Sequence, residues 1–248
     1  LYNMIAAGQA MKLVSDKGRE EEGYHNSGLV VGADSGIQSF DQLKGKKIGI
    51  TTIGSTQHYA IAKMLEKHGI AANEVEWTPL NTVSAVSEAL KGKHIEAAYM
   101  NEPNVTIAVT QGFAKVLAWT SDEIDFQTAG IVFSPKFSQN REAGVQFLKA
   151  YLRGAQYYYD AVLQRNSAGE LIKGGNYDEV LDILVEYTGQ KREVLEQSFS
   201  FIDPQGKLDL ENVKAQIQWY HDQGLIRSVL DVGQFVDTSM IEEALNQL

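Results

Sequence analysis

Residues 46–69 constrain the fold of this chain more than any other stretch. They predict a short buried strand at residues 48–50, a polar turn, and then a helix that stops at Gly69. Apolar residues recur along the helix at intervals of three and four. The rest of the chain is interpreted around this strand–turn–helix unit, and with the alternation described below it predicts an α/β fold.

The polar turn between strand and helix is the first candidate binding element. It consists of Gly54, Ser55, Thr56, Gln57 and His58. A helix begins with backbone N–H groups that lack a partner inside it, and its dipole adds partial positive charge there. The turn could therefore hold a carboxylate, sulfonate or phosphate without Lys or Arg. The alternative is an ordinary cap, in which Ser or Thr only stabilises the helix.

Strands and helices are expected to alternate from Leu29 to Phe133. This alternation favours a sheet of parallel strands with right-handed crossovers. A charged loop running through Arg19 and Glu20 is expected between the first two strands. The expected strands cover residues 10–18, 28–32, 48–50, 75–77, 95–100, 115–119 and 129–133.

The pattern changes to helices alone after residue 140. An apolar stripe from Val145 to Val162 predicts one long helix. Further helices are expected around residues 180–187, with Ile183 and Tyr187 on the apolar face, around 213–220, capped by Asp209, and at 237–245. Residues 1–10 resemble the middle of an amphipathic helix, and any signal peptide would lie outside this sequence. We therefore expect the chain to be a fragment of a longer protein.

Several function classes are disfavoured by composition. The net charge of −10 argues against nucleic acid as a partner, and no window is apolar for long enough to span a membrane. The chain has no Cys, and its five His residues show no metal-binding spacing. We therefore expect no metal site, no cofactor and no catalytic residues.

Glu102 is a second candidate, because it directly follows the expected strand at residues 95–100. Proteins of the α/β class place ligand contacts at such strand ends. Alternatively, Glu102 is a first-turn acid that complements the dipole of the next helix. The sequence leaves both roles open.

Three ordered segments resemble a known family. They are SGLVVGADSGIQSFDQLKGKKIGITTIGSTQHY (residues 27–59), LKGKHIEAAYMNEP (residues 90–103) and QWYHDQGLI with FVDTSMIEEAL (residues 218–226 and 235–245). Together they are similar to the periplasmic substrate-binding components of ABC importers. Within these, they look most like the nitrate/sulfonate/taurine and thiamine-pyrimidine-precursor group.

The resemblance implies a type II periplasmic-binding-protein fold, with two α/β lobes around a ligand cleft and two crossing strands between them. Residues 1–28 and 132–248 would form the first lobe, without its N-terminal part, and residues 29–131 the second. The residues that it implies at the ligand are Gly54, Ser55, Thr56, Gln57, His58, Asn101, Glu102, Tyr24, Asn26 and Thr128.

The function implied is that of an extracytoplasmic solute-binding component, not an enzyme. It would capture a small polar or anionic solute by hinge closure and deliver it to an ABC permease, acting as a periplasmic or lipid-anchored monomer. Two alternatives remain. One is an enzyme of the same fold, in menaquinone or thiamine-pyrimidine biosynthesis, for which only His25 or His58 could serve. The other is the effector-binding domain of a regulator.

Overall fold

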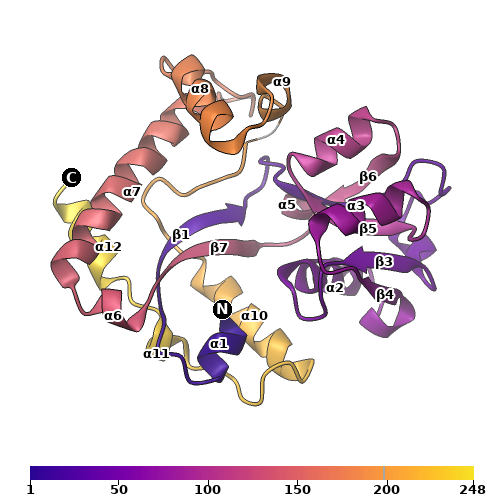
Figure 1. Ribbon diagram of the computed structural model, residues 1–248, viewed down its shortest axis with the longest axis horizontal. Coiled ribbons are helices and arrows are strands. Elements are labelled where there is room, and N and C mark those ends of the chain that lie inside the picture. The colour runs from indigo at the N-terminus through magenta and orange to yellow at the C-terminus, as the bar shows by residue number, and fades with distance from the viewer. Residues whose placement is uncertain (198) are drawn as a thin grey trace. The chain divides into compact units, whose positions relative to one another are not determined.

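The computed structural model describes residues 1–197 and 199–248, and contacts divide the chain into two units (Figure 1). Unit 1 comprises residues 1–19, 127–182 and 201–248, and unit 2 comprises residues 20–126 and 183–200. The chain therefore passes from one unit to the other four times: near the end of β1 (Lys12–Glu20), near the start of β7 (Phe126–Phe133), after Asp182 and after Ser200.

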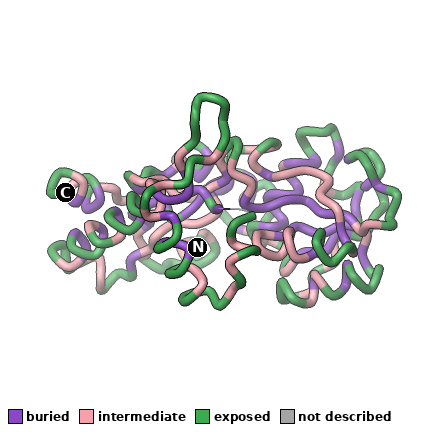
Figure 2. Tube along the Cα trace, turned by 90° about the horizontal axis from the view of Figure 1, so that it is seen from above, coloured by how far each residue is buried: buried purple, intermediate pink, exposed green. Residues whose placement is uncertain are grey.

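Unit 2 is built on a five-stranded sheet in the order β4-β3-β5-β2-β6. Figure 2 shows buried backbone running along the strands of this unit. The strands are β2 (Ser27–Gly32), β3 (Lys47–Ile50), β4 (Glu76–Pro79), β5 (Ala97–Asn101) and β6 (Ala114–Trp119). Its helices are η1 (Phe40–Leu43), α2 (Thr56–Lys67), η2 (Ala72–Glu74), α3 (Val83–Lys91), α4 (Asn104–Thr110), α5 (Thr120–Glu123) and α9 (Arg192–Leu195).

Helices cover the sheet of unit 2. α3 and α4 pack on one face, where Val86, Leu90 and Val105 meet Ala98 and Met100 of β5 in one apolar cluster. The connections β3-α2-β4 and β4-α3-β5 cross the sheet in opposite directions, so right-handed crossovers put α2 on the other face from α3. The apolar residues that recur along α2 are fully buried, as their spacing predicted: Ala60, Ile61, Met64 and Leu65.

Unit 1 is mainly helical around the two-stranded sheet of β1 and β7. Val14 and Phe133 from this sheet pack with Leu148 and Leu152 of α7 and Ile241 of α12. The helices are α1 (Tyr2–Ala6), α6 (Pro135–Ser138), α7 (Arg141–Val162), the start of α8 (Tyr177–Thr188), α10 (Leu210–Asp222), α11 (Val232–Phe235) and α12 (Ser239–Asn246).

The expectation of one parallel sheet from Leu29 to Phe133 was wrong for two strands, because β7 pairs with β1 in a separate sheet and β2 runs against its neighbours. β3 runs parallel to both β4 and β5, but β2 lies antiparallel between β5 and β6. A helical crossover makes strands parallel only where it connects them. No such helix joins β2 directly to β5 or β6. In the chain, β2 is followed by a loop, the short η1 turn and β3, which is not its neighbour in the sheet.

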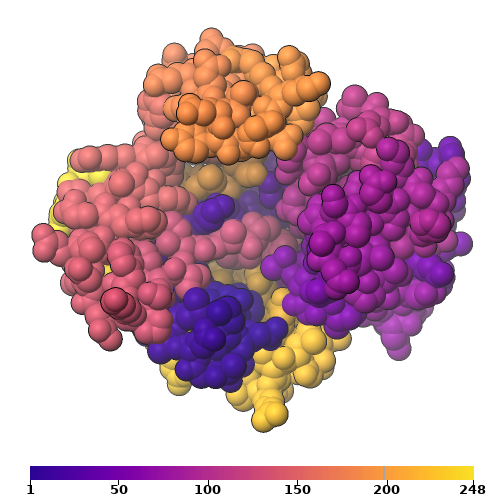
Figure 3. All heavy atoms as spheres, in the orientation of Figure 1, coloured from indigo at the N-terminus to yellow at the C-terminus, as the bar shows by residue number. Residues whose placement is uncertain are grey.

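Three local expectations also need correction. Arg19 and Glu20 do not lie in a charged loop but complete β1, where Glu20 is buried. On α8, Ile183 and Tyr187 are 41% and 83% exposed, so they are not on a core-facing stripe. α1 buries no residue, and it lies at the surface as the indigo spheres of Figure 3.

Candidate functional site

The turn between β3 and α2 is organised by the side chains that follow it. Gly54 has φ +77°, a left-handed conformation that glycine adopts without strain. Ser55 is the N-cap of α2, and its Oγ accepts a hydrogen bond from the His58 N–H (3.2 Å). The cap that the sequence offered as the alternative role of Ser55 is therefore present, and it starts the helix directly after the turn.

Gln57 and His58 point inward, and they are only 6% and 5% exposed. The Gln57 Oε1 accepts from the Thr51 N–H (2.9 Å), and the His58 Nδ1 accepts from the Gly54 N–H (3.1 Å). The His58 ring also meets the Trp77 ring edge-on, with centroids 4.5 Å apart. Burial lowers the pKa of His58. Both side chains thus stabilise the turn through hydrogen bonds to its backbone N–H groups.

The positive end of α2 remains available to an anion. Among the described residues, the N–H groups of Thr56 and Gln57 have no acceptor. Thr56 is exposed and Ser55 is half-buried. Two aligned N–H donors at the start of a 12-residue helix can bind a carboxylate, sulfonate or phosphate oxygen.

Asn101 and Glu102 lie at the same edge of the sheet as this turn, because β3 and β5 are parallel neighbours and both end there. The Glu102 carboxylate accepts from the N–H and the hydroxyl of Thr106, both at 3.1 Å. It therefore stabilises the first turn of α4. Burial raises the pKa of Glu102, although the bonds from Thr106 oppose that shift.

Asn26 adjoins this edge, whereas Thr128 belongs to unit 1. The Glu102 N–H donates to the Asn26 carbonyl oxygen (2.8 Å), and the buried Asn26 side chain bonds Glu20 and Ser200. Tyr24, two residues before Asn26, is half-buried. Its backbone forms an isolated β-bridge with Glu21. Thr128 lies on β7, and its hydroxyl donates to the Gly18 carbonyl oxygen (2.7 Å).

Sequence reasoning missed a buried carboxyl group. The Oε1 of Glu20 accepts from Ser27 and Asn26, and the Ser27 hydroxyl also bonds Tyr99 and Thr120. Burial raises the pKa of Glu20 to about 7. The sequence did carry a sign of this, because Glu20 lies four residues after Asp16. In a strand, that spacing places both side chains on one face.

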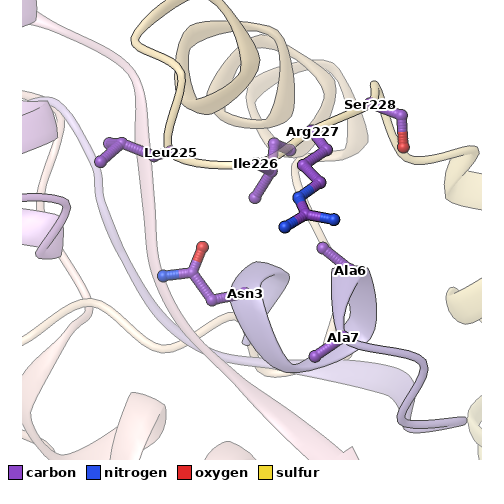
Figure 4. Close-up of a pocket in the computed structure, with 7 residues that line it drawn as sticks. All are labelled: Asn3, Ala6, Ala7, Leu225, Ile226, Arg227 and Ser228. Carbon is purple, nitrogen blue, oxygen red and sulfur yellow. The ribbon is translucent and has the colours of Figure 1, made fainter.

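Each unit also has a pocket large enough for a small molecule, away from the turn between β3 and α2. One of about 350 Å³ separates α1 from the segment after α10, and Figure 4 shows the Arg227 guanidinium reaching toward α1. Another, of about 310 Å³, lies in unit 2 beside Gly32, Lys93 and Phe113. Neither contains a residue expected to bind ligand, and most of the residues lining the first are exposed.

The described residues form neither a metal site nor a membrane-spanning helix. Residues 1–197 and 199–248 contain no group of three His, Asp or Glu side chains placed to hold a metal ion. In the same residues, no helix is both long and apolar enough to cross a bilayer.

Comparisons with known proteins agree on the kind of fold. Residues 24–161 match the family described as NMT1/THI5 like. A Bacillus subtilis (strain 168) protein named for binding aliphatic sulfonates is 25% identical over 250 residues, which cover 98% of this chain and 70% of that protein. The structure of the periplasmic aliphatic sulphonate binding protein SsuA from Escherichia coli superimposes with a TM-score of 0.71 at 19% identity, over 96% of this chain and 77% of that one.

One solved structure of similar fold is an enzyme. The desulfurization enzyme DSZB superimposes with a TM-score of 0.67 at 14% identity, over 97% of this chain and 80% of that chain. The type II periplasmic-binding-protein fold is therefore shared by binding proteins and by at least one catalyst.

Proposed function

Because the chain belongs to the NMT1/THI5-like family, we propose that it is the solute-binding component of an ABC importer and that it binds a small organic anion, such as a sulfonate. The observation that carries this proposal is the pair of N–H groups at Thr56 and Gln57, which point out of the start of α2 without an acceptor among the described residues. The relatives named for sulfonates support the choice of ligand class.

The chemistry of this site favours an anion of low charge. Backbone N–H groups offer partial positive charge, so they can hold one sulfonate or carboxylate group without the full desolvation cost of pairing it with a lysine. Glu102 lies at the same edge of the sheet and disfavours a second negative charge. A solute with one acidic group and an uncharged remainder fits these constraints best.

The protein would work outside the cytoplasm, as a monomer that hands its solute to a membrane permease. Binding there needs no covalent step, because the solute is only captured and released. Any hinge motion of the two units would follow from a higher solute affinity of one conformation than of the other.

A substitution at Thr56 tests the site directly. Thr56 is the first residue of α2, where proline fits a helix well. Ser55 before it has φ −74° and ψ 165°, the extended conformation that proline requires of its predecessor. Thr56→Pro therefore removes one outward N–H group and should leave the helix intact. We expect the affinity for ethanesulfonate to fall at least about tenfold in calorimetry, the usual effect of losing a hydrogen bond to a charged group.

The matched control is Thr56→Ala, which keeps the N–H group and removes only the hydroxyl. It should bind ethanesulfonate more tightly than Thr56→Pro. Circular dichroism and the melting temperature of both variants would verify that folding is preserved. If the proline variant binds as tightly as the wild type, the start of α2 is not the anion site.

A further inference from the structure

His58 occupies an unusual place in the candidate site. It lies in the first turn of α2, yet its side chain is buried and turned back toward the chain that precedes the helix. The Gly54 N–H donates to the His58 Nδ1 (3.1 Å), and the His58 N–H donates to the Ser55 Oγ (3.2 Å). One residue thus fixes both sides of the turn that leads into the helix.

The hydrogen bond from Gly54 determines the protonation state of the ring. A nitrogen that accepts a hydrogen bond carries no proton, so the neutral ring holds its proton on Nε2. A second proton on Nδ1 would face the Gly54 N–H, and two donors cannot bond each other. Protonation of His58 would therefore break the contact that holds Gly54 in its left-handed conformation.

We propose that His58 is a positioning residue, whose neutral imidazole holds the turn in the shape that presents the Thr56 and Gln57 N–H groups to an anion, so that protonation of His58 weakens anion binding. This inference rests on the proposed function, and it assigns to His58 a role through Gly54 in place of a ligand contact. It predicts an affinity that falls on acidification, although a positive charge near the site would by itself attract an anion.

The groups around His58 determine the pH at which its ring becomes protonated. Burial lowers its pKa, so protonation occurs below the usual range for histidine. Charged groups on the elements around α2 are paired: Glu76 of β4 with Lys47, Glu74 of η2 with Lys44, Asp122 of α5 with His25, and Glu123 of α5 with Lys67 and His68. Tyr99 of β5 is buried and neutral.

Glu102, which follows β5, is the group that could confuse the result. Its pKa is raised by burial, so it also takes up a proton on acidification. Loss of that negative charge would strengthen anion binding, which is the opposite of the effect proposed for His58. The sign of the pH dependence therefore separates the two residues.

Two substitutions of His58 test the role. Asparagine places an amide oxygen close to the position of Nδ1, so His58→Asn can accept from Gly54 but cannot titrate. His58→Ala removes the acceptor. We expect ethanesulfonate affinity at pH 7.5 to be within about threefold of the wild type for His58→Asn and about tenfold weaker for His58→Ala. Between pH 7.5 and pH 5 it should fall for the wild type, and stay flat or rise for His58→Asn.

The control is His68→Asn, at the C-cap of the same helix. His68 stacks on Phe40 and pairs with Glu123 at the far end of α2. Its substitution should leave both the affinity and its pH profile unchanged. The same pH dependence in the wild type and in His58→Asn would overturn the proposal.

A measurement without ligand keeps the two proposals distinguishable. NMR should detect a scalar coupling across the hydrogen bond between the Gly54 nitrogen and the His58 Nδ1 at pH 7.5, and this coupling should disappear as His58 is protonated. Its absence at pH 7.5 would contradict the positioning role whatever the protein binds. Failure of the wild type to bind any small sulfonate or carboxylate would contradict the proposed function, whereas equal affinities of the wild type and His58→Ala would contradict only the role of His58.

Discussion

At the scale of single residues, Glu20 lies in an environment that differs strongly from water. It is 4% exposed, its Oε1 has two donors, and its Oε2 has no hydrogen-bond partner among the described residues. A buried carboxylate loses hydration that these partners replace only in part. The neutral acid is therefore favoured, and the pKa of Glu20 rises to about 7.

The stability of the protein should depend on pH through Glu20. The pKa of Glu20 is higher in the folded chain than in the unfolded chain, so the folded state binds this proton more tightly. The resulting stability is present at low pH and is lost as pH rises from about 4.5 through about 7. We expect the free energy of unfolding in urea to fall by up to about 3 kcal/mol between pH 4.5 and pH 8, and by clearly less in Glu20→Gln.

Asp16 and Glu102, whose pKa values are also raised by burial, should leave a residual slope at the acidic end. Glu22→Gln is the control, because Glu22 is exposed and follows β1 by two residues. It should keep the pH dependence of the wild type. Parallel curves for Glu20→Gln and the wild type would show that Glu20 is ionised throughout.

At the scale of elements, the packing of α3 on the sheet depends on Gly49 in β3. A Cβ added to Gly49 would lie 2.4 Å from the Ile95 Cδ1 and 3.3 Å from the Val86 Cγ1 of α3. Because Ile95 and Val86 are buried in the same apolar cluster, neither can move without disturbing it. Gly49→Ala should lower the free energy of unfolding by about 1–3 kcal/mol in urea denaturation.

Gly154 of α7 is the matched control, since nothing lies within 4 Å of the position its Cβ would occupy. Glycine is costly inside a helix, so Gly154→Ala should raise the free energy of unfolding by about 0.5–1 kcal/mol. Equal effects of the two substitutions would mean that α3 does not approach β3 as closely as the structure shows.

At the scale of the whole molecule, binding and catalysis predict different fates for the solute. Sulfonate at 1,000 times its dissociation constant should add about 4 kcal/mol to the free energy of unfolding and raise the melting temperature. Mass spectrometry after prolonged incubation should recover all of the ethanesulfonate unaltered. Conversion of the sulfonate would contradict the proposal that the protein only binds its solute.

Much of this protein could be predicted from the sequence by itself. The strand β3, helices α2, α7 and α10, the caps Ser55 and Asp209, and the family follow from residue spacing and from ordered motifs. These features depend on main-chain hydrogen bonding and on contacts between residues close in sequence, so a local pattern is enough to specify them.

Only the tertiary structure decided where several side chains point. Gln57 turns inward because it accepts a hydrogen bond from the Thr51 N–H. His58 turns inward because it accepts one from the Gly54 N–H and packs against the Trp77 ring. Glu20 is buried because Asn26 and Ser27, from the next strand, supply donors. β2 is antiparallel because it enters the sheet between β5 and β6. Each of these outcomes depends on the packing of neighbours brought together by the fold, which the spacing of one segment does not encode.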